Sequence, residues 1–441
     1  MNLEAWLNLL EQRHPQAIDL GLERCGAVYH QLDSTRPANQ VFTVAGTNGK
    51  GSTVAYLAAL SGAMGLRYGT YTSPHIFRFN ERISIMGEPV SDDCLVKAFE
   101  QVELARDDIS LTYFEFTTLA GLLILQQSEL DCAILEVGLG GRLDTVNLVD
   151  TDCAVITPIG LDHQDFLGPD LNSIAKEKAG IIRPGTPVVC TEKNPPGPIL
   201  RQSESLQAAV YRRGLEYDFV GFPGRDDGLL KFSLDGRSMS VAEPLMTGVH
   251  QLDNLAAALA AFALLNPGCF LKADEISDAI SDTRIPGRLQ TVASSPEILL
   301  DVGHNELAAG VVADYLEHSG KTNITCVLAM LADKHAEEVA VALSKVCKRW
   351  SCADSPGERG QAGELLARRI KAALPDSEIV AFGPLDIVLQ EVVSGASEDE
   401  TILVFGSFST VAAAVAWVQN CMQHDSHDAA KITRRGPGTK P

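Results

Sequence analysis

The chain has 441 residues, of which 45% are hydrophobic and 21% are charged, and its formal net charge is −21. This composition is typical of a soluble globular protein with two or three domains, and the acidic balance argues against a nucleic-acid-binding or anionic-membrane surface. No apolar run approaches the roughly 18 residues of a membrane span, no signal-peptide pattern occurs, and the ten cysteines form no C-x-x-C pair. We therefore expect a cytoplasmic protein with reduced thiols.

Strand-like and helical patterns alternate along the first part of the chain. The expected strands are 41–45, 132–137, 153–159 and 187–190, and the expected helices are 52–64, 94–105, 116–127 and 171–179. Such alternation predicts parallel βαβ units that bind ligands at the carboxyl ends of the strands. Short alternating runs with Asp-Gly turns over 211–243 predict an antiparallel hairpin patch, followed by a helix at about 252–265.

The segment Arg284-Ile-Pro-Gly-Arg288 contains a Pro-Gly pair, which interrupts regular secondary structure, and we predict a domain boundary and hinge there. Beyond it, strands are expected at 298–302, 324–329, 379–382 and 401–405, and helices at 306–318, 337–346, 361–373 and 410–419. The prediction is an α/β protein. Residues 1–287 form a P-loop-type, doubly wound, mostly parallel sheet domain, and residues 288–421 form a smaller Rossmann-like α/β domain. The polar, Pro/Gly-containing residues 422–441 are expected to be a disordered tail.

The most informative stretch is Val41-Phe-Thr-Val-Ala-Gly-Thr-Asn-Gly-Lys-Gly-Ser-Thr-Val54. A buried strand, a glycine-rich turn and a helix start follow one another, which is the geometry that binds phosphate through backbone N–H groups. Lys50 would supply a cation to the phosphates, and Ser52 or Thr53 an oxygen near Mg²⁺. Gly51 separates Lys50 from Ser52, which departs from the usual G-x-x-x-x-G-K-[ST] spacing. An ordinary glycine turn is the alternative, but the residue types in this order predict a nucleoside triphosphate site.

Four further residues have chemistry suited to such a site. Ser73 follows a strand, Glu136 ends a buried strand before three glycines, His163 follows the next strand, and Lys178 lies near a helix end. A carboxylate at the end of a buried strand needs a partner such as a metal ion. Taken alone, Ser73 fits a Ser-Pro turn, His163 fits a hydrogen-bonded structural residue because Mg²⁺ prefers oxygen ligands, and Lys178 fits a solvated helix-end lysine.

Five segments, in this order, resemble the motif set of the Mur ligase superfamily: Gly46–Ser52, Thr72–His75, Glu136–Asp144, Asp162–His163 and Glu177–Ile181. More narrowly, they resemble the folylpolyglutamate synthases and their bifunctional dihydrofolate synthase/folylpolyglutamate synthase members. The resemblance runs from about Trp6 to Trp417. It implies a monomeric, ATP-dependent amide ligase that adds L-glutamate to dihydropteroate and to reduced folates through an acyl phosphate.

The resemblance also assigns roles to residues. Lys50, His163 and Lys178 would be catalytic, with Lys178 carbamylated, and Ser73, Glu136 and His163 would ligate Mg²⁺, of which two ions are expected. ATP would bind to Thr47, Asn48, Gly49, Lys50, Gly51, Ser52, Asn254, Arg288, Asp301 and His304, with Asn254 at the base. Dihydropteroate would bind to Asp19, Leu20, Gly21, Leu22, Thr112, Tyr113, Phe114, Glu115, Leu143, Asp144 and Thr145. Aromatic faces such as Tyr113 and Phe114 can stack on a flat heterocycle, although they also fit a core pair at a helix entry.

Two departures and three alternatives accompany this interpretation. His335 stands where the family usually has Asp, and Ala332 where a bulkier or polar residue is common, so the glutamate contacts of that loop are open. The alternatives are a monofunctional folylpolyglutamate synthase, a Mur-type peptidoglycan ligase acting on a UDP-sugar, and a nucleotide-dependent switch. The Leu20–Arg24 and Tyr113–Glu115 motifs argue against the second, and the lack of an Asn-Lys-x-Asp motif argues against the third.

Overall fold

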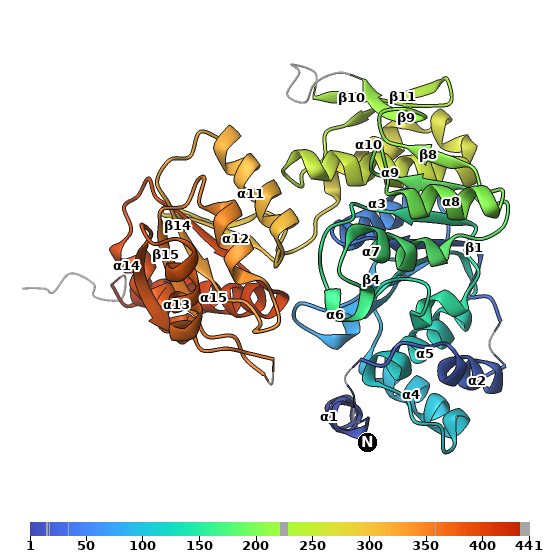
Figure 1. Cartoon of the computed structure of the whole chain (residues 1–441), viewed down its shortest axis with the longest axis horizontal. Coiled ribbons are helices and arrows are strands. Elements are labelled where there is room, and N and C mark those ends of the chain that lie inside the picture. The colour runs from blue at the N-terminus through green and yellow to red at the C-terminus, as the bar shows by residue number, and fades with distance from the viewer. Residues whose placement is uncertain (15, 17, 34, 221–227, 358, 433–441) are drawn as a thin grey trace, which may run out of the picture. The chain divides into compact units, whose positions relative to one another are not determined.

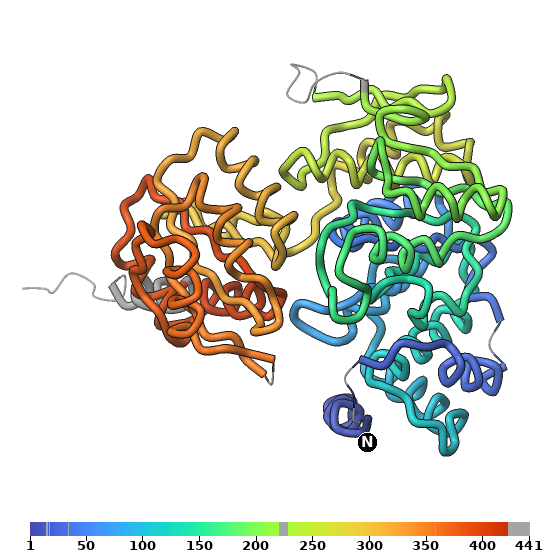
Figure 2. Tube along the Cα trace, in the orientation of Figure 1, coloured from blue at the N-terminus to red at the C-terminus, as the bar shows by residue number. Residues whose placement is uncertain are grey.

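The computed structural model describes residues 1–441 except 15, 17, 34, 221–227, 358 and 433–441, and for 422–432 it describes the helical backbone alone. The chain forms two compact units, Met1–Ile285 and Pro286–Pro441. In Figure 1 and Figure 2 the first unit runs from blue to yellow and the second from orange to red. Each unit is built around its own sheet.

The first unit contains an eight-stranded sheet in the order β4-β3-β2-β5-β1-β6-β7-β8. Its strands are β1 (Ala38–Ala45), β2 (Tyr68–Tyr71), β3 (Ile83–Ile85), β4 (Glu88–Pro89), β5 (Leu130–Glu136), β6 (Cys153–Ile156), β7 (Val188–Cys190) and β8 (Val210–Arg212). The six strands from β2 to β8 in this order pair in parallel, and at the β4 edge the pairs β2–β3 and β3–β4 are antiparallel, so that only β3 runs against the other strands. The carboxyl ends of the central strands therefore meet at one edge of the sheet, where ligands bind in such folds.

Both faces of this sheet are covered, because its central strands are apolar on both sides. In β1, Val41 and Ala45 belong to one hydrophobic core, and Phe42 and Val44 to the other. The first core includes α1 (Leu3–Arg13), α2 (Glu23–Gln31), α4 (Asp92–Arg106), α5 (Tyr113–Gln126), α7 (Leu171–Lys178) and α8 (Gly197–Ser205). The second core includes α3 (Lys50–Ala63), α9 (Val249–Leu265), α10 (Ala273–Asp282) and an antiparallel sheet of β9 (Tyr217–Val220), β10 (Leu229–Leu234) and β11 (Arg237–Ala242), as Figure 1 shows.

The second unit repeats the two-faced arrangement around a six-stranded sheet, β12-β13-β17-β14-β15-β16, in which only the edge strand β12 is antiparallel. Its strands are β12 (Gln290–Ser294), β13 (Glu297–Asp301), β14 (Ile324–Leu328), β15 (Arg349–Ala353), β16 (Glu378–Gly383) and β17 (Thr401–Phe405). Helices α11 (Glu306–His318), α12 (Ala336–Leu343) and α13 (Gly363–Ala373) pack on one face, and α14 (Leu385–Gly395) and α15 (Phe408–Ile432) pack on the other.

The predicted fold class, an α/β protein with two mostly parallel sheets, is confirmed. One local prediction was wrong. Residues 210–212 form β8 on the large sheet, so only 217–242 make the antiparallel patch, and its segment 221–227 lies outside the described residues. The backbone of residues 422–432 continues α15, residues 433–441 lie outside the described residues, and the disordered tail stays a prediction.

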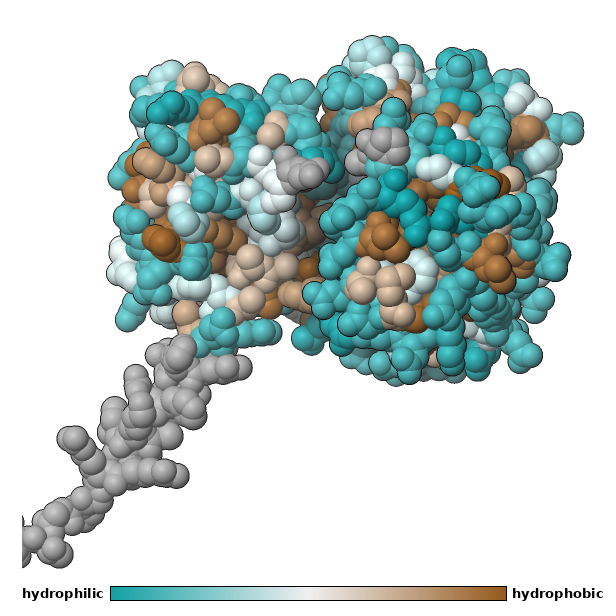
Figure 3. Space-filling view, turned by 90° about the horizontal axis from the view of Figure 1, so that it is seen from below, coloured by the Kyte–Doolittle hydropathy of each residue, from teal (hydrophilic) through white to brown (hydrophobic). Residues whose placement is uncertain are grey.

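The described helices include none that is long and apolar enough to cross a bilayer. On the face drawn in Figure 3, hydrophilic residues dominate and the hydrophobic ones form separate patches. Exposed apolar residues in such small groups are normal for a protein surface.

Candidate functional site

The glycine-rich turn between β1 and α3 is held against the loop after β6. The Thr47 N–H donates to the Pro158 carbonyl (2.9 Å), and the Thr47 hydroxyl both donates to the carbonyl of Gly160 (3.1 Å) and accepts from its N–H (3.0 Å). Helix α3 begins at Lys50, with Gly49 as its N-cap. The first N–H groups of a helix have no intrahelical acceptor, so this turn presents donors that suit an anion.

Two glycines of the turn allow close packing that a side chain would prevent. A Cβ on Gly46 would lie 1.7 Å from Oγ1 of Thr157. Gly49 has φ +86°, and a Cβ there would lie 2.4 Å from Oδ1 of Asn254, a buried residue of α9. The structure therefore places Asn254, predicted at the nucleotide base, directly against the start of α3. The amide of Asn254 also donates to Oε1 of Gln251 (3.2 Å).

We expect Gly49→Ala to destabilise the first unit and to weaken nucleotide binding. A left-handed alanine costs about 1–2 kcal/mol, and the contact with Asn254 adds to that cost. Gly185→Ala is the matched control, because Gly185 has φ +71° but nothing lies within 4 Å of the position that an alanine Cβ would take. Urea unfolding of both variants should show the larger loss for Gly49→Ala. Equal losses of unfolding free energy in the two variants would mean that the contact with Asn254 does not affect stability.

Two lysines converge on one carbonyl of the turn. Nζ of Lys50 donates to the carbonyls of Gly46 (3.2 Å) and Thr47 (3.3 Å), and Nζ of Lys178 donates to the same Gly46 carbonyl (2.8 Å). Lys178 is only 3% exposed, so the solvated helix-end interpretation of this residue is wrong. Burial, and then the neighbouring charge of Lys50, lower the pKa of Lys178 to about 7. Its amine is therefore substantially neutral near pH 7.

The carboxylates at this edge of the sheet are also buried. Glu136, the last residue of β5, lies with its Oε2 3.4 Å from the backbone N–H of Ser73, so these two predicted metal ligands come together. Asp144 accepts the N–H groups of Leu139 (2.8 Å) and Val146 (2.9 Å), and burial raises its pKa to about 6. The structure thus uses Asp144 to shape the glycine loop that follows Glu136, and Leu143 and Thr145 flank it.

His163 is the third predicted metal ligand, and it occupies the N-cap of the short helix α6 (Gln164–Leu167) with φ +52°. Its Nε2 lies 3.9 Å from Oδ1 of Asp162, which also accepts the His163 N–H (2.9 Å). A histidine in the left-handed region is uncommon and is held by its surroundings. Helices α6 and α7 follow His163 in the chain, and α7 carries Lys178.

The residues present fit a divalent cation on a nucleotide. Ser52 is 1% exposed and its hydroxyl oxygen has no hydrogen-bond partner among the described residues, which leaves one hard oxygen donor available beside Lys50. The described residues contain no group of three or more His, Cys, Asp or Glu side chains arranged for a metal ion. The expected ligands, one hydroxyl, one carboxylate and one imidazole, are too few for an all-protein cage, and Mg²⁺ characteristically takes its other ligands from phosphates and water.

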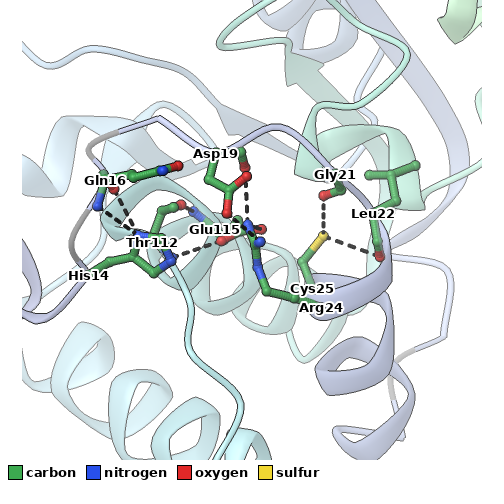
Figure 4. A network of polar contacts seen from close by, with 9 residues as sticks. All are labelled: His14, Gln16, Asp19, Gly21, Leu22, Arg24, Cys25, Thr112 and Glu115. Atoms are coloured by element: carbon green, nitrogen blue, oxygen red, sulfur yellow. Dashed lines mark hydrogen bonds and ion pairs between the residues drawn. The ribbon is translucent and has the colours of Figure 1, made fainter.

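Two of the three predicted pterin segments, Asp19–Leu22 and Thr112–Glu115, meet in a polar network, drawn in Figure 4. Thr112 and Glu115 make a capping box at the start of α5, and the Arg24 guanidinium donates to the carboxylates of Glu115 (2.9 Å) and Asp19. Arg24 therefore joins the segment Asp19–Leu22 to Thr112–Glu115. Sequence patterns alone do not single out Arg24, although the Thr-x-x-Glu spacing of the capping box is a recognisable signal.

Tyr113 and Phe114 lie in the first turn of α5, as a helix-entry pair would. Phe114 packs against the glycine loop, since a Cβ on Gly138 would lie 2.4 Å from its ring. Tyr113 makes an edge contact with Phe79, at 6.3 Å between ring centroids. The structure thus brings the predicted aromatic pair to the same edge of the sheet as Asp144.

In the second unit, Arg288 and Asp301 lie close enough to interact. Asp301 ends β13, accepts the N–H groups of Leu289 (3.0 Å) and Gly303 (2.7 Å), and is buried, which raises its pKa against the opposing effect of Arg288. The guanidinium carbon of Arg288 lies 5.5 Å from the ring centroid of Phe408. Nδ1 of His304 lies 3.0 Å from the Val302 carbonyl. His335 has a 60% exposed side chain at the N-cap of α12.

The described site combines a glycine-rich turn at the start of a helix, two lysines on one carbonyl and a buried carboxylate at a strand end. Residues 44–262 match the Mur ligase middle domain, and residues 287–408 match the Mur ligase glutamate ligase domain. The chain is 38% identical to the dihydrofolate synthase/folylpolyglutamate synthase of Escherichia coli K12, over 93% of this chain and 94% of that protein.

Solved structures agree with this likeness. The structure of E. coli FolC in complex with DHPP and ADP matches with a TM-score of 0.88 and 38% identity, over 96% of this chain and 99% of that one. The bifunctional enzyme of Yersinia pestis, complexed with AMPPNP and Mn, matches with a TM-score of 0.84 and 37% identity, over 95% and 98%. The chain belongs to the dihydrofolate synthase/folylpolyglutamate synthase family of Mur ligases.

Proposed function

We propose that this protein is the ATP-dependent ligase that adds L-glutamate to dihydropteroate, giving dihydrofolate, and to reduced folates, giving folylpolyglutamates. The observation that carries the proposal is the turn Gly46–Lys50 with Lys50 and Lys178 on one carbonyl, beside Glu136 and Ser73. The 38% identity to a bifunctional relative over nearly the whole of both chains supports the two acceptors. The match to a glutamate ligase domain supports L-glutamate as the substrate that supplies the amine.

The chemistry proceeds in two displacements. A substrate carboxylate oxygen attacks the γ-phosphorus of ATP, the bond to the β-phosphate oxygen breaks, and ADP leaves. The amine of glutamate then attacks the carbonyl carbon of the acyl phosphate, the C–O bond breaks, and inorganic phosphate departs while the amine loses a proton. The backbone N–H groups at the start of α3 and the Lys50 ammonium orient the phosphates and offset their charge.

Mg²⁺ would be held by Ser73, Glu136 and His163, with Ser52 as a further oxygen donor, and would supply charge stabilisation to the phosphates. Thr47, Asn48, Gly49 and Gly51 would contact the phosphates, and Asn254 would contact the nucleotide from α9. Arg288, Asp301 and His304 remain predicted nucleotide contacts of the second unit. The roles of Asp19–Leu22, Thr112–Glu115 and Leu143–Thr145 at the pterin likewise remain predictions.

Lys178 is proposed to be carbamylated. A neutral amine attacks CO₂, forms a C–N bond and releases a proton, and the lowered pKa of Lys178 makes that amine available near pH 7. The modification would place an anion beside the ammonium of Lys50, and the two groups would attract each other, whereas the protonated form of Lys178 is repelled by Lys50.

The acyl-phosphate route is tested by following the transfer of one labelled oxygen atom from the substrate carboxylate to phosphate. With ¹⁸O in the carboxylate of dihydropteroate, released phosphate should carry the label, because that oxygen leaves with phosphorus when glutamate attacks. Amide formation with unlabelled phosphate would contradict the acyl-phosphate route. ADP release that depends on glutamate, measured with dihydropteroate and with tetrahydrofolate, tests the two acceptors. A protein that extends only tetrahydrofolate is a monofunctional folylpolyglutamate synthase.

A further inference from the structure

Arg82 ends the short 3₁₀ helix η1 (Phe79–Arg82) before β3, and its guanidinium lies among aromatic rings. The guanidinium carbon is 5.1 Å from the ring centroid of Phe79 and 5.6 Å from that of Tyr113. Its Nε donates to Nδ1 of His75 (3.1 Å). The residue is only 8% exposed. A nearly buried arginine is normally paired with a carboxylate.

No carboxylate among the described residues pairs with Arg82. Glu81, its neighbour in sequence, instead accepts the backbone N–H groups of residues 76–78, at 2.7–3.3 Å. Asp92 accepts from Asn80 (2.9 Å) and from Arg78 (3.2 Å). Cation–π contacts recover only part of the cost of removing a guanidinium from water. The charge of Arg82 is therefore uncompensated within the part of the chain that the structure describes.

The two terminal nitrogens of Arg82 donate to no described residue, and neither is fully buried. They therefore reach solvent while the rest of the side chain is enclosed. The planar fork of an arginine presents two parallel N–H groups at its terminal nitrogens, and this geometry matches a carboxylate. The two ring contacts and the hydrogen bond from Nε to His75 restrain the guanidinium before any ligand arrives.

The backbone places this fork between two parts of the proposed site. The carbonyl of Arg82 accepts the N–H of Thr72 (2.8 Å), the residue before Ser73. Tyr113, whose ring it faces, precedes Phe114 in the first turn of α5. The guanidinium of Arg82 thus contacts both the segment Thr72–His75, through His75, and the first turn of α5, through Tyr113.

We propose that Arg82 binds a carboxylate of the pterin-bearing substrate and so positions that substrate between Tyr113 and the Ser73 loop. This inference rests on the proposed function, because both proposed acceptors are carboxylates. Dihydropteroate has one carboxylate, which is the reacting group. A reduced folate with a terminal glutamate has the reacting γ-carboxylate and a free α-carboxylate.

The experiment compares an acid with its amide. Binding of dihydropteroate and of its carboxamide analogue, which has the same rings without the charge, is measured without ATP by calorimetry on wild type and Arg82→Met. We expect the variant to lose tenfold or more in affinity for the acid and less than threefold for the amide. Loss for both dihydropteroate and tetrahydrofolate assigns Arg82 to the reacting carboxylate. Loss for tetrahydrofolate alone assigns it to the α-carboxylate.

Arg78→Met is the matched control, because Arg78 lies in the same loop with a 71% exposed side chain and should leave both affinities unchanged. Arg82→Lys keeps a cation over the rings but loses the fork, so its acid-to-amide affinity ratio should fall between those of wild type and Arg82→Met. If Arg82→Met does not fold, the acid-to-amide affinity ratio of Arg82→Lys is compared with that of wild type alone, and a lower ratio is expected. Unchanged acid binding by Arg82 variants of a protein that shows glutamate-dependent ADP release would overturn this inference alone. Wild type that binds neither acceptor and releases no ADP would overturn the proposed function.

Discussion

Lys50→Ala should abolish glutamate addition to both acceptors while the protein stays folded. The ammonium of Lys50 lies on the carbonyls of Gly46 and Thr47, in the turn proposed to bind the phosphates, and Lys50 is the first residue of α3. Groups that stabilise charge on a transferring phosphoryl group contribute roughly 10²–10⁵-fold to the rate. We therefore expect turnover to fall by at least about 10²-fold with dihydropteroate and with tetrahydrofolate alike.

The measurement is the rate of ADP formation with each acceptor at saturating glutamate. Lys176→Ala is the control, since Lys176 is an exposed lysine of α7 that should leave turnover unchanged. Circular dichroism of the variant checks that the protein stays folded. A folded Lys50→Ala protein with near-normal turnover would show that ATP binds elsewhere.

Lys178→Ala should lose activity by roughly 10²-fold or more, and short carboxylic acids such as formate or acetate should restore part of it. The reason is that the proposed carbamate acts as a carboxylate at the Gly46 turn, and a small acid can occupy the space that the shortened side chain leaves. Mass spectrometry of the intact protein should show an added carboxyl group that is lost in CO₂-free buffer. An active alanine variant, or a site that stays unmodified in bicarbonate, would contradict this.

The pH dependence follows from the lowered pKa of Lys178. The neutral amine reacts with CO₂, and its fraction rises as pH increases through about 7, so activity at limiting CO₂ should rise between pH 6 and pH 8. Without CO₂, the unfolded chain binds one more proton than the folded chain between pH 7 and the ordinary lysine pKa. The free energy of unfolding should therefore rise with pH across that range. Lys178→Met should remove this slope.

Local pattern is enough to predict the class of fold, because both sheets consist of short apolar strands separated by helices. Local pattern does not predict the element boundaries and strands that capping or tertiary contacts determine. Hydrophobic pattern puts the start of α5 at Phe116, but the capping box of Thr112 and Glu115 begins the helix at Tyr113. The strand β15 was not predicted, because Arg349 and Ser351 interrupt its apolar residues, although Trp350 is fully buried.

Some features of the candidate site could likewise be predicted from local sequence, and others could not. The glycine-rich turn between β1 and α3 could be predicted because strand, glycines and lysine are contiguous in sequence. The burial of Lys178 could not, since its acceptor, Gly46, is 132 residues away. The contact of Asn254 with Gly49 and the contact of Arg82 with Tyr113 also depend on chain segments that meet only after folding. Spacing along the chain carries no information about such meetings.

The contact between Gly49 and Asn254 links nucleotide binding to the order in which the protein is made. Helix α9 follows the whole of the large sheet in sequence, yet it supplies the side chain that lies against the first turn of α3. A nascent chain that has not yet exposed residue 254 has the complete glycine turn without this support. Bound nucleotide at 100 times its dissociation constant would add about 2.7 kcal/mol to the stability of the finished unit and little to the shorter one. ATP in the cell thus favours the first unit only once α9 has docked.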